Sequence, residues 1–291
     1  MSAATSATIR DAAATRGPRR FRPGRIGAYA LLTVGSLLVA FPLLITLSYS
    51  FMSESDIITF PPPVLPKNPT LHNYEQVLQA IPIGRYLLNS FVVSTAVVIG
   101  QLITASLAAF AFSFVQFRGR TLLFFIFLST LMIPWEATII PNYITIRSIG
   151  WLDTYQGLAV PFMATAFGTF LLRQAFLQIP RELWDSARID GASTLRFFRS
   201  MVLPLSRPAL GTVAIYGFLS TYNQYFWPLL ITNQTLMRTT QVGIAQLRFE
   251  ESLRWGLVMA GVVMVAVPTL ALLVIGQRQL IRGLTAGAVK G

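Results

Sequence analysis

The sequence lacks most of the residues on which enzymes and metal-binding proteins rely. It contains no cysteine, which excludes disulfides, thiolate metal sites, iron–sulfur clusters and a cysteine nucleophile. Its one histidine, His72, lies in the polar stretch PKNPTLHNYEQ, where a Ser-His-Asp triad is not expected. The pattern GxxxxGK[ST] is absent too. We therefore expect no catalytic residue, metal or cofactor on this chain, and any dependence on ATP must come from a partner.

Charged residues are also scarce. They make up 12% of the chain, against about 25% in a typical soluble domain, while hydrophobic residues make up 54%. Too few polar side chains remain to cover a water-facing globule, so lipid must provide much of the surroundings. The net charge of +12 would suggest nucleic acid or an anionic surface as the partner of a soluble protein. The positions of the charges decide between these interpretations.

Six long apolar runs each approach or exceed the roughly 20 residues that a helix needs to cross a bilayer. They predict an all-α polytopic membrane protein with one domain over residues 27–281. Glu136 is the only formal charge within a run. The runs are Gly27–Phe51, Tyr86–Val115, Thr121–Ile146, Thr154–Leu172, Pro208–Met237 and Trp255–Gln277.

The basic residues lie mainly on one side of these six spans. That side, which includes both termini, holds 17 of the 23 Lys and Arg residues. Because basic loops stay in the cytoplasm, residues 1–26 and 282–291 are predicted to be cytoplasmic tails. The Arg-rich start resembles a mitochondrial transit peptide, but the uncharged run after it is too long for a signal peptide and indicates a retained span. Topology thus explains the net charge without nucleic acid.

The predicted cytoplasmic segment 180–207 has the pattern of two short amphipathic helices. The first follows Pro180, and Asp190-Gly191 ends it, because glycine adopts the left-handed conformation easily. Ser193 is a suitable cap for the second helix, which Pro204 is expected to stop. The expected apolar faces consist of Leu183, Trp184 and Ala187, and of Leu195, Phe198, Met201 and Val202.

Two interpretations of this segment are open on physical grounds. Arg188, Arg196 and Arg199 suit anionic lipid headgroups, whereas a projecting turn suits a partner protein. The acids Glu182 and Asp185 favour the protein, because anionic lipid would repel them.

The spacing within this segment resembles the EAA motif of permease subunits in bacterial ABC importers, particularly of the carbohydrate-uptake branch. That motif is EAA, three residues, G, nine residues, I, one residue, LP. Here Asp, Ser and Met replace Glu, Ala and Ile, and every spacing matches. The residues concerned are Asp185, Ser186, Ala187, Asp190, Gly191, Met201, Leu203 and Pro204.

The resemblance implies the permease fold of type I ABC importers and a multi-pass location in the bacterial inner membrane. It also implies that segment 180–207 docks into a cleft of an ABC ATPase dimer, which carries ATP and magnesium. Asp185 stands where the usual glutamate pairs with a basic group of the ATPase, and the shorter side chain puts that particular pair in doubt. A companion permease, an extracytoplasmic substrate-binding protein and membrane lipid are the other implied partners.

Candidates for the substrate pathway are polar and aromatic residues within the spans, since a buried polar group in lipid is costly. Glu136 has three open roles: in the pathway or a gate, as a structural hydrogen-bond partner, or at the interface. The fifth span adds a mixture of amides and aromatic rings that suits a polyol or sugar. These residues are Tyr222, Asn223, Gln224, Tyr225 and Trp227.

The expected substrate is glycerol-3-phosphate or a glycerophosphodiester. Stretches such as TLMIPWEATIIP and NQYFWPLL are similar to permeases of that kind, and Gln224 replaces an acid that would repel an anion. No Lys or Arg lies firmly inside a span, so phosphate recognition would fall to the binding protein or the companion permease. A neutral oligosaccharide is the alternative. A secondary transporter would need repeats or several intramembrane charges, which the sequence does not offer.

Overall fold

The structure is a computed structural model that describes residues 23–248 and 254–285, with side chains over 27–248 and 254–277. Within these ranges every regular element is a helix. The all-α prediction is therefore confirmed. The predicted cytoplasmic tails fall largely outside the described residues, because 1–22 and 286–291 are not among them.

The chain divides into two units, one up to Ile45 and one from Thr46. The described part of the first unit belongs to helix α1, Pro23–Ser50. The stretch Gly27–Ser50 of this helix is long and apolar enough to cross a membrane. Its large side chains, such as Leu38 and Val39, are exposed. Apolar side chains exposed on such a helix suit a lipid environment.

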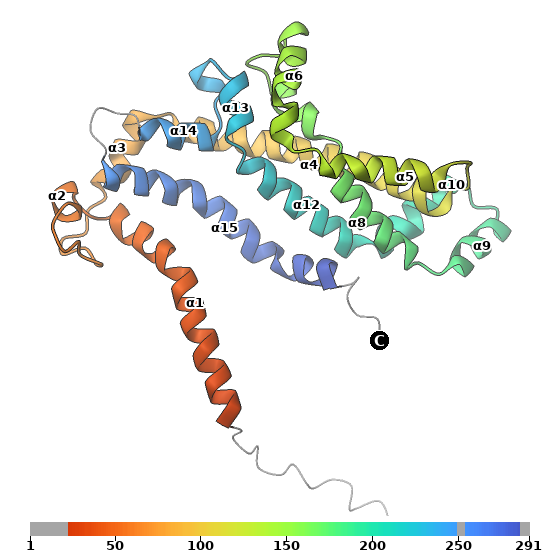
Figure 1. Ribbon diagram of the computed structural model, residues 1–291, viewed down its shortest axis with the longest axis horizontal. Helices are drawn as coiled ribbons and strands as arrows, with labels where there is room; N and C mark the ends of the chain where they lie inside the picture. Colours follow the sequence, from red (N-terminus) through yellow and green to blue (C-terminus); the bar gives the residue numbers. More distant parts are fainter. Residues whose placement is uncertain (1–22, 249–253, 286–291) are drawn as a thin grey trace, which may run out of the picture. The chain divides into compact units, whose positions relative to one another are not determined.

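The second unit is built around one long helix, α4 (Ile83–Phe114). Helices α8 (Ala166–Leu177) and α12 (Arg207–Tyr222) pack against α4, and α12 in turn packs against α15 (Trp255–Thr285) (Figure 1). At 1.5 Å per residue the 32 residues of α4 extend about 48 Å, more than the hydrocarbon thickness of about 30 Å. We conclude that α4 either tilts in the bilayer or projects beyond it.

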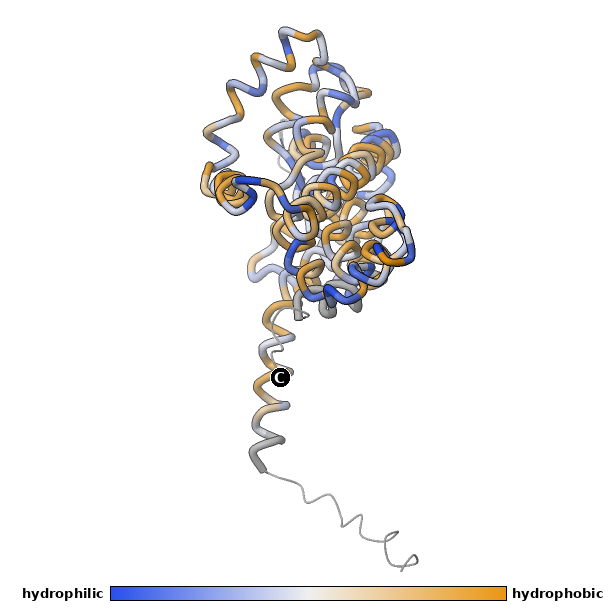
Figure 2. The backbone as a smooth tube through the Cα atoms, turned by 90° about the vertical axis from the view of Figure 1, so that its right-hand side faces the viewer, coloured by the Kyte–Doolittle hydropathy of each residue, from blue (hydrophilic) through white to orange (hydrophobic). Residues whose placement is uncertain are grey.

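Short helices connect these long ones. The tube in Figure 2 is mostly hydrophobic along the helices, and many of its hydrophilic residues lie in the turns between them. The remaining elements are α2 (Glu54–Ile57), α3 (His72–Ala80), α5 (Arg120–Ser129), η2 (Thr130–Met132), α6 (Trp135–Ser148), α7 (Tyr155–Ala159), η3 (Val160–Phe162), α9 (Arg181–Ile189), α10 (Thr194–Phe197), η4 (Phe198–Val202), α11 (Leu203–Leu205), α13 (Phe226–Ile231), η5 (Thr235–Met237) and α14 (Thr240–Leu247).

Three helices of the described residues are long and apolar enough to cross a membrane alone, and the number reaches six if each of three bent pairs is one span. The predicted six spans agree with the larger number. The third, fourth and fifth apolar runs are not continuous helices. The third bends by 95° between Met132 and Trp135, and the fourth by 46° before Ala166. The fifth apolar run extends to Met237, but α12 ends at Tyr222.

Proline explains two of these breaks. Pro134 precedes α6, and its ring disfavours the helical conformation at Ile133, whose backbone is extended. In a continuous fifth span, Pro228 would offer no N–H to the carbonyl of Gln224 and its ring would collide with that carbonyl. The chain instead leaves the helix at Asn223 and restarts as α13 at Phe226.

Small and amide side chains hold the helices of the second unit together. At Gly217 on α12, an added Cβ would collide with the side chain of Gln101 on α4, so glycine permits this close approach. Gln101 Nε2 donates a hydrogen bond of 2.9 Å to the carbonyl of Phe162. Gln101 is thus an interhelical hydrogen-bonding residue.

Candidate functional site

Segment 180–207 contains the left-handed turn that the sequence predicts. Gly191 follows α9 with φ of +72°, a conformation that residues with a Cβ seldom adopt. Its N–H donates to the carbonyl of Arg188 at 3.1 Å, and the N–H of Ala192 donates to the carbonyl of Ala187 at 2.8 Å. These two bonds form a Schellman motif, which satisfies carbonyls at the end of α9.

The second half of the segment differs in part from the prediction. Ser193 caps α10 as predicted, since its Oγ accepts a bond from the N–H of Arg196 at 3.3 Å. Leu195, however, is 52% exposed, and Phe197 is buried in its place. Nor does Pro204 stop the helix, which continues through a π-helical turn, Phe198–Val202, to Leu205. The wider turn shifts the buried face, and it ends two residues before Pro204, which has no N–H for a regular helix.

An aromatic cluster fixes both short helices to the end of α4. The ring of Trp184 on α9 lies 4.7 Å from that of Phe197 and 6.2 Å from that of Phe114, measured between centroids. The predicted stripe of Leu183, Trp184 and Ala187 packs against the same core. The apolar face of α9 is therefore used within this chain, and the outward side is left to polar residues and to Ile189, which is 87% exposed.

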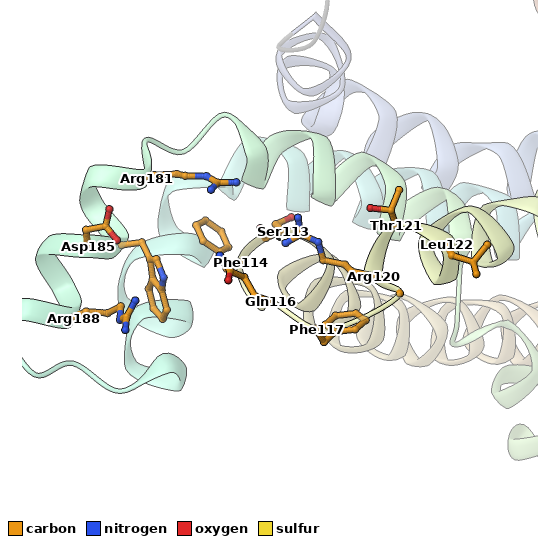
Figure 3. Close-up of a pocket in the computed structure, with 12 residues that line it drawn as sticks. Ser113, Phe114, Gln116, Phe117, Arg120, Thr121, Leu122, Arg181, Asp185 and Arg188 are labelled. Atoms are coloured by element: carbon orange, nitrogen blue, oxygen red, sulfur yellow. Dashed lines mark hydrogen bonds between the residues drawn. The ribbon is translucent and has the colours of Figure 1, made fainter.

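A polar cavity of about 500 Å³ lies between α9 and the turn from α4 to α5 (Figure 3). Asp185, Arg181 and Arg188 line it from α9, and Arg120 lines it from the start of α5. The guanidinium of Arg120 donates to the carbonyl of Val115 at 3.2 Å. It thereby satisfies a carbonyl just beyond the end of α4. Arg120 reaches the motif only through the fold, whereas Arg181 lies one turn before Asp185 on the same helix.

Asp185 forms no ion pair within this cavity. Arg181 and Arg188 stand one helical turn before and after it, yet no described basic group lies within 4.0 Å of its carboxylate. Asp185 and Ser186 are exposed, as is Asp190 at the end of the helix. The motif acid is thus accessible to a group outside the chain.

The structure places Glu136 at the break in the third span. It is exposed in the first turn of α6, where the helix dipole favours an acid. The adjacent Trp135 is half-buried, and its ring lies 4.6 Å from that of Phe162 and 5.7 Å from that of Trp227. All three roles that the sequence leaves open for Glu136 stay predictions.

The five aromatic and amide residues of the fifth span are divided by the fold. Tyr222 is buried, and its hydroxyl donates to the carbonyl of Val265 at 3.2 Å. Trp227 is buried as well, and its Nε1 donates to the carbonyl of Gly157 at 3.0 Å. Asn223 is exposed and Gln224 and Tyr225 are half-buried at the break between α12 and α13. These three side chains remain accessible, whereas the two buried rings belong to the core.

The chain resembles known proteins over most of its length. A family model described as "Binding-protein-dependent transport system inner membrane component" matches residues 101–282. The chain is 38% identical over 269 residues to the sn-glycerol-3-phosphate transport system permease protein UgpE of Agrobacterium fabrum, which covers 89% of this chain and 95% of that protein. Identity to the protein of the same name in Yersinia enterocolitica is 35% over 267 residues, with the same coverage of both chains.

Solved structures give the same picture. A chain in the crystal structure of a bacterial ABC transporter involved in the import of the acidic polysaccharide alginate matches with a TM-score of 0.79 and 25% identity, over 90% of this chain and 99% of that one. A chain from the alginate transporter in complex with an alginate pentasaccharide-bound periplasmic protein matches with a TM-score of 0.64 and 16% identity, over 87% and 92%. The second match shows the fold alone.

Proposed function

The chain belongs to the inner membrane components of binding-protein-dependent transport systems, and from this premise we propose that it forms half of the translocation pathway for glycerol-3-phosphate or glycerophosphodiesters. Such components are permease subunits and not enzymes, and the ATPase is a separate subunit. The predicted permease fold of ABC importers is confirmed by the alginate transporter match.

The proposed substrate rests chiefly on the relatives. Glycerol-3-phosphate permeases from Agrobacterium, Yersinia and other bacteria are 35–38% identical to this chain over 88–89% of its length. The solved relative also serves an acidic substrate. A neutral oligosaccharide, the alternative, drew support from the aromatic residues of the fifth span. Two of those rings, Tyr222 and Trp227, are core side chains, which weakens that support.

The surface of α9 supports a second proposal, that segment 180–207 docks into the ABC ATPase dimer. The accessible carboxylate of Asp185 would meet a basic group of the ATPase, and the exposed Ile189 would meet an apolar part of its cleft. Both groups belong to the short helix α9, which also contains Ser186 and Ala187. The left-handed turn at Gly191 follows this helix. ATP and magnesium would act on the ATPase, and no nucleic acid is involved.

The remaining partners and the orientation are proposals of the same kind. A companion permease would complete the pathway, and an extracytoplasmic binding protein would deliver substrate to the opposite side from α9. The excess of basic residues favours both termini in the cytoplasm. Fusions of green fluorescent protein or alkaline phosphatase to the C-terminus test this orientation. We expect the green fluorescent protein fusion to fluoresce and the alkaline phosphatase fusion to be inactive. A dark first fusion with an active second one would contradict a cytoplasmic C-terminus.

Reconstitution of the complete importer in vesicles tests the substrate. Binding protein is supplied outside and ATP inside, and uptake of labelled glycerol-3-phosphate, glycerophosphocholine and maltose is compared. We expect ATP-dependent uptake of one or both phosphates and little uptake of maltose. Uptake of maltose alone would overturn the proposed substrate but leave the family unchanged.

A further inference from the structure

A second cavity lies at the other end of the fold, beside the break in the fifth span. Its volume is about 280 Å³, and it is an open pocket lined by Tyr225, α13, α14 and the segment that joins these helices. Tyr225, Asn233 and Gln246 contribute a hydroxyl and two amides to its wall, and Arg238 contributes the only charge among its lining residues. Arg238 directly follows the fifth apolar run, so by its place in the sequence it is an ordinary loop cation.

The backbone that carries Arg238 is held firmly by α4. Asn89, buried within that helix, donates from Nδ2 to the carbonyl of Leu236 at 2.8 Å and to that of Arg238 at 2.9 Å. Its Oδ1 accepts a bond of 2.7 Å from the hydroxyl of Tyr155. Two residues on, the N–H of Thr240 donates to the hydroxyl of Ser90 at 2.9 Å. Arg238 thus extends from a fixed support, as a recognition residue requires.

The positive charge of Arg238 is not neutralised by any carboxylate of the described residues. The guanidinium is half-buried and interacts with the neutral hydroxyl of Tyr86, which also donates to Oε1 of Gln246 at 3.4 Å. No carboxylate of residues 27–248 or 254–277 lies within 4.0 Å of it. A partly buried cation without a counter-ion in these ranges favours an anionic ligand, since the field of the charge is weakly screened there.

We propose that this cavity is a phosphate subsite of the permease itself, in which Arg238 binds the phosphate of the substrate as it leaves the binding protein. The planar guanidinium suits two oxygens of a phosphate, and the amides and the hydroxyl of Tyr225 suit the glycerol hydroxyls. A volume of 280 Å³ equals that of about nine waters at about 30 Å³ each, enough for glycerol-3-phosphate. This inference rests on the proposed function, and it assigns to this chain a recognition role that the sequence analysis left to its partners.

The test uses the complete importer in vesicles, with Arg238→Gln, Arg238→Lys and the matched control Arg147→Gln. Arg147 is exposed near the end of α6 and lines neither of the two cavities described. Uptake of labelled glycerol-3-phosphate and ATP hydrolysis stimulated by loaded binding protein are measured together. We expect Arg238→Gln to reduce uptake per ATP by about tenfold to a hundredfold, Arg238→Lys by less, and Arg147→Gln by less than twofold.

The ratio of substrate uptake to ATP hydrolysis distinguishes a role of Arg238 in substrate recognition from a role in the stability of the fold. A purely structural role for Arg238 would lower assembly, hydrolysis and uptake in parallel, without rescue by lysine, and that result would overturn the proposal. Wild-type uptake per ATP in Arg238→Gln would overturn it as well. If the wild-type importer moves no glycerophosphate, the proposed function fails before any variant is compared, so the two failures are distinguishable.

Discussion

The left-handed turn at Gly191 yields the sharpest prediction about coupling. Its φ of +72° is unfavourable for any residue with a Cβ, by about 1–2 kcal/mol. A Cβ built at this position meets no atom within 4 Å, so alanine would add backbone strain without a collision. The loss of function in Gly191→Ala would therefore measure the turn alone. Asparagine, which tolerates this conformation, is the matched control, and valine should be the worst replacement.

The expected magnitude follows from where the strain is relieved. In the free permease the variant turn can unwind, because it is exposed, whereas docking into the ATPase would require the native turn again. Docking would then weaken by up to 1–2 kcal/mol, which is about a 5- to 30-fold rise in Kd. Binding of the ATPase dimer to permease pairs in nanodiscs measures this Kd, and stimulated hydrolysis in vesicles should fall in the same order: Gly, Asn, Ala, Val.

Two results would refute this reasoning. Equal affinities of the ATPase dimer for the glycine, asparagine, alanine and valine proteins would show that docking does not depend on the conformation of the turn. An asparagine variant as weak as valine would show that the loss comes from side-chain bulk and not from backbone strain. Insertion into the membrane should be unchanged in all four proteins, because the turn lies outside the apolar spans.

Three further predictions concern other contacts. Asp185→Asn should lower stimulated ATP hydrolysis at least tenfold. Hydrolysis with Asp185→Glu, or with the matched neutralisation Glu182→Gln, should stay within threefold of the wild-type rate. Equal losses in the two neutralised variants would contradict a specific role of Asp185. Trp184→Ala should lower stability by about 2–4 kcal/mol, seen as a lower Tm in detergent, because its ring contacts to α4 and α10 are lost, and an unchanged Tm would refute the aromatic anchor. Asn89→Ala should lower stability by about 2–5 kcal/mol, since two carbonyls and a hydroxyl lose their partner, and wild-type thermal stability would argue against that clamp.

Features that depend on neighbouring residues were predictable from the sequence. The end of α9 at Asp190-Gly191 and the cap at Ser193 follow from residue types at fixed spacing, and the structure has both. The six apolar runs were also found, because hydropathy requires no knowledge of the fold. The motif acid Asp185 was recognisable by its spacing, but its accessibility was not, since that depends on how α9 packs against α4.

The positions of the breaks within the spans and the cavity that Arg238 lines were not predictable in the same way. Hydropathy treats Pro208–Met237 as one run, although Pro228 is incompatible with a regular helix across Gln224. The position of Arg238 depends on Asn89, which lies about 150 residues earlier in the chain. The burial of Tyr222 and Trp227 likewise results from contacts with distant helices. Spacing along the sequence carries no information about such contacts.

Helix α4 has a mechanical consequence for the transporter. Phe114 at one end packs against the helices of the motif segment, and Asn89 near the other end holds the loop of Arg238. No proline interrupts the 32 residues of this helix. The 25 residues between these two positions extend about 37 Å, so a tilt of about 5° about Phe114 would displace Asn89 by about 3 Å. Helix α4 can therefore act as a lever, in which a small tilt at the motif segment displaces the cavity that Arg238 lines, without a hinge between them.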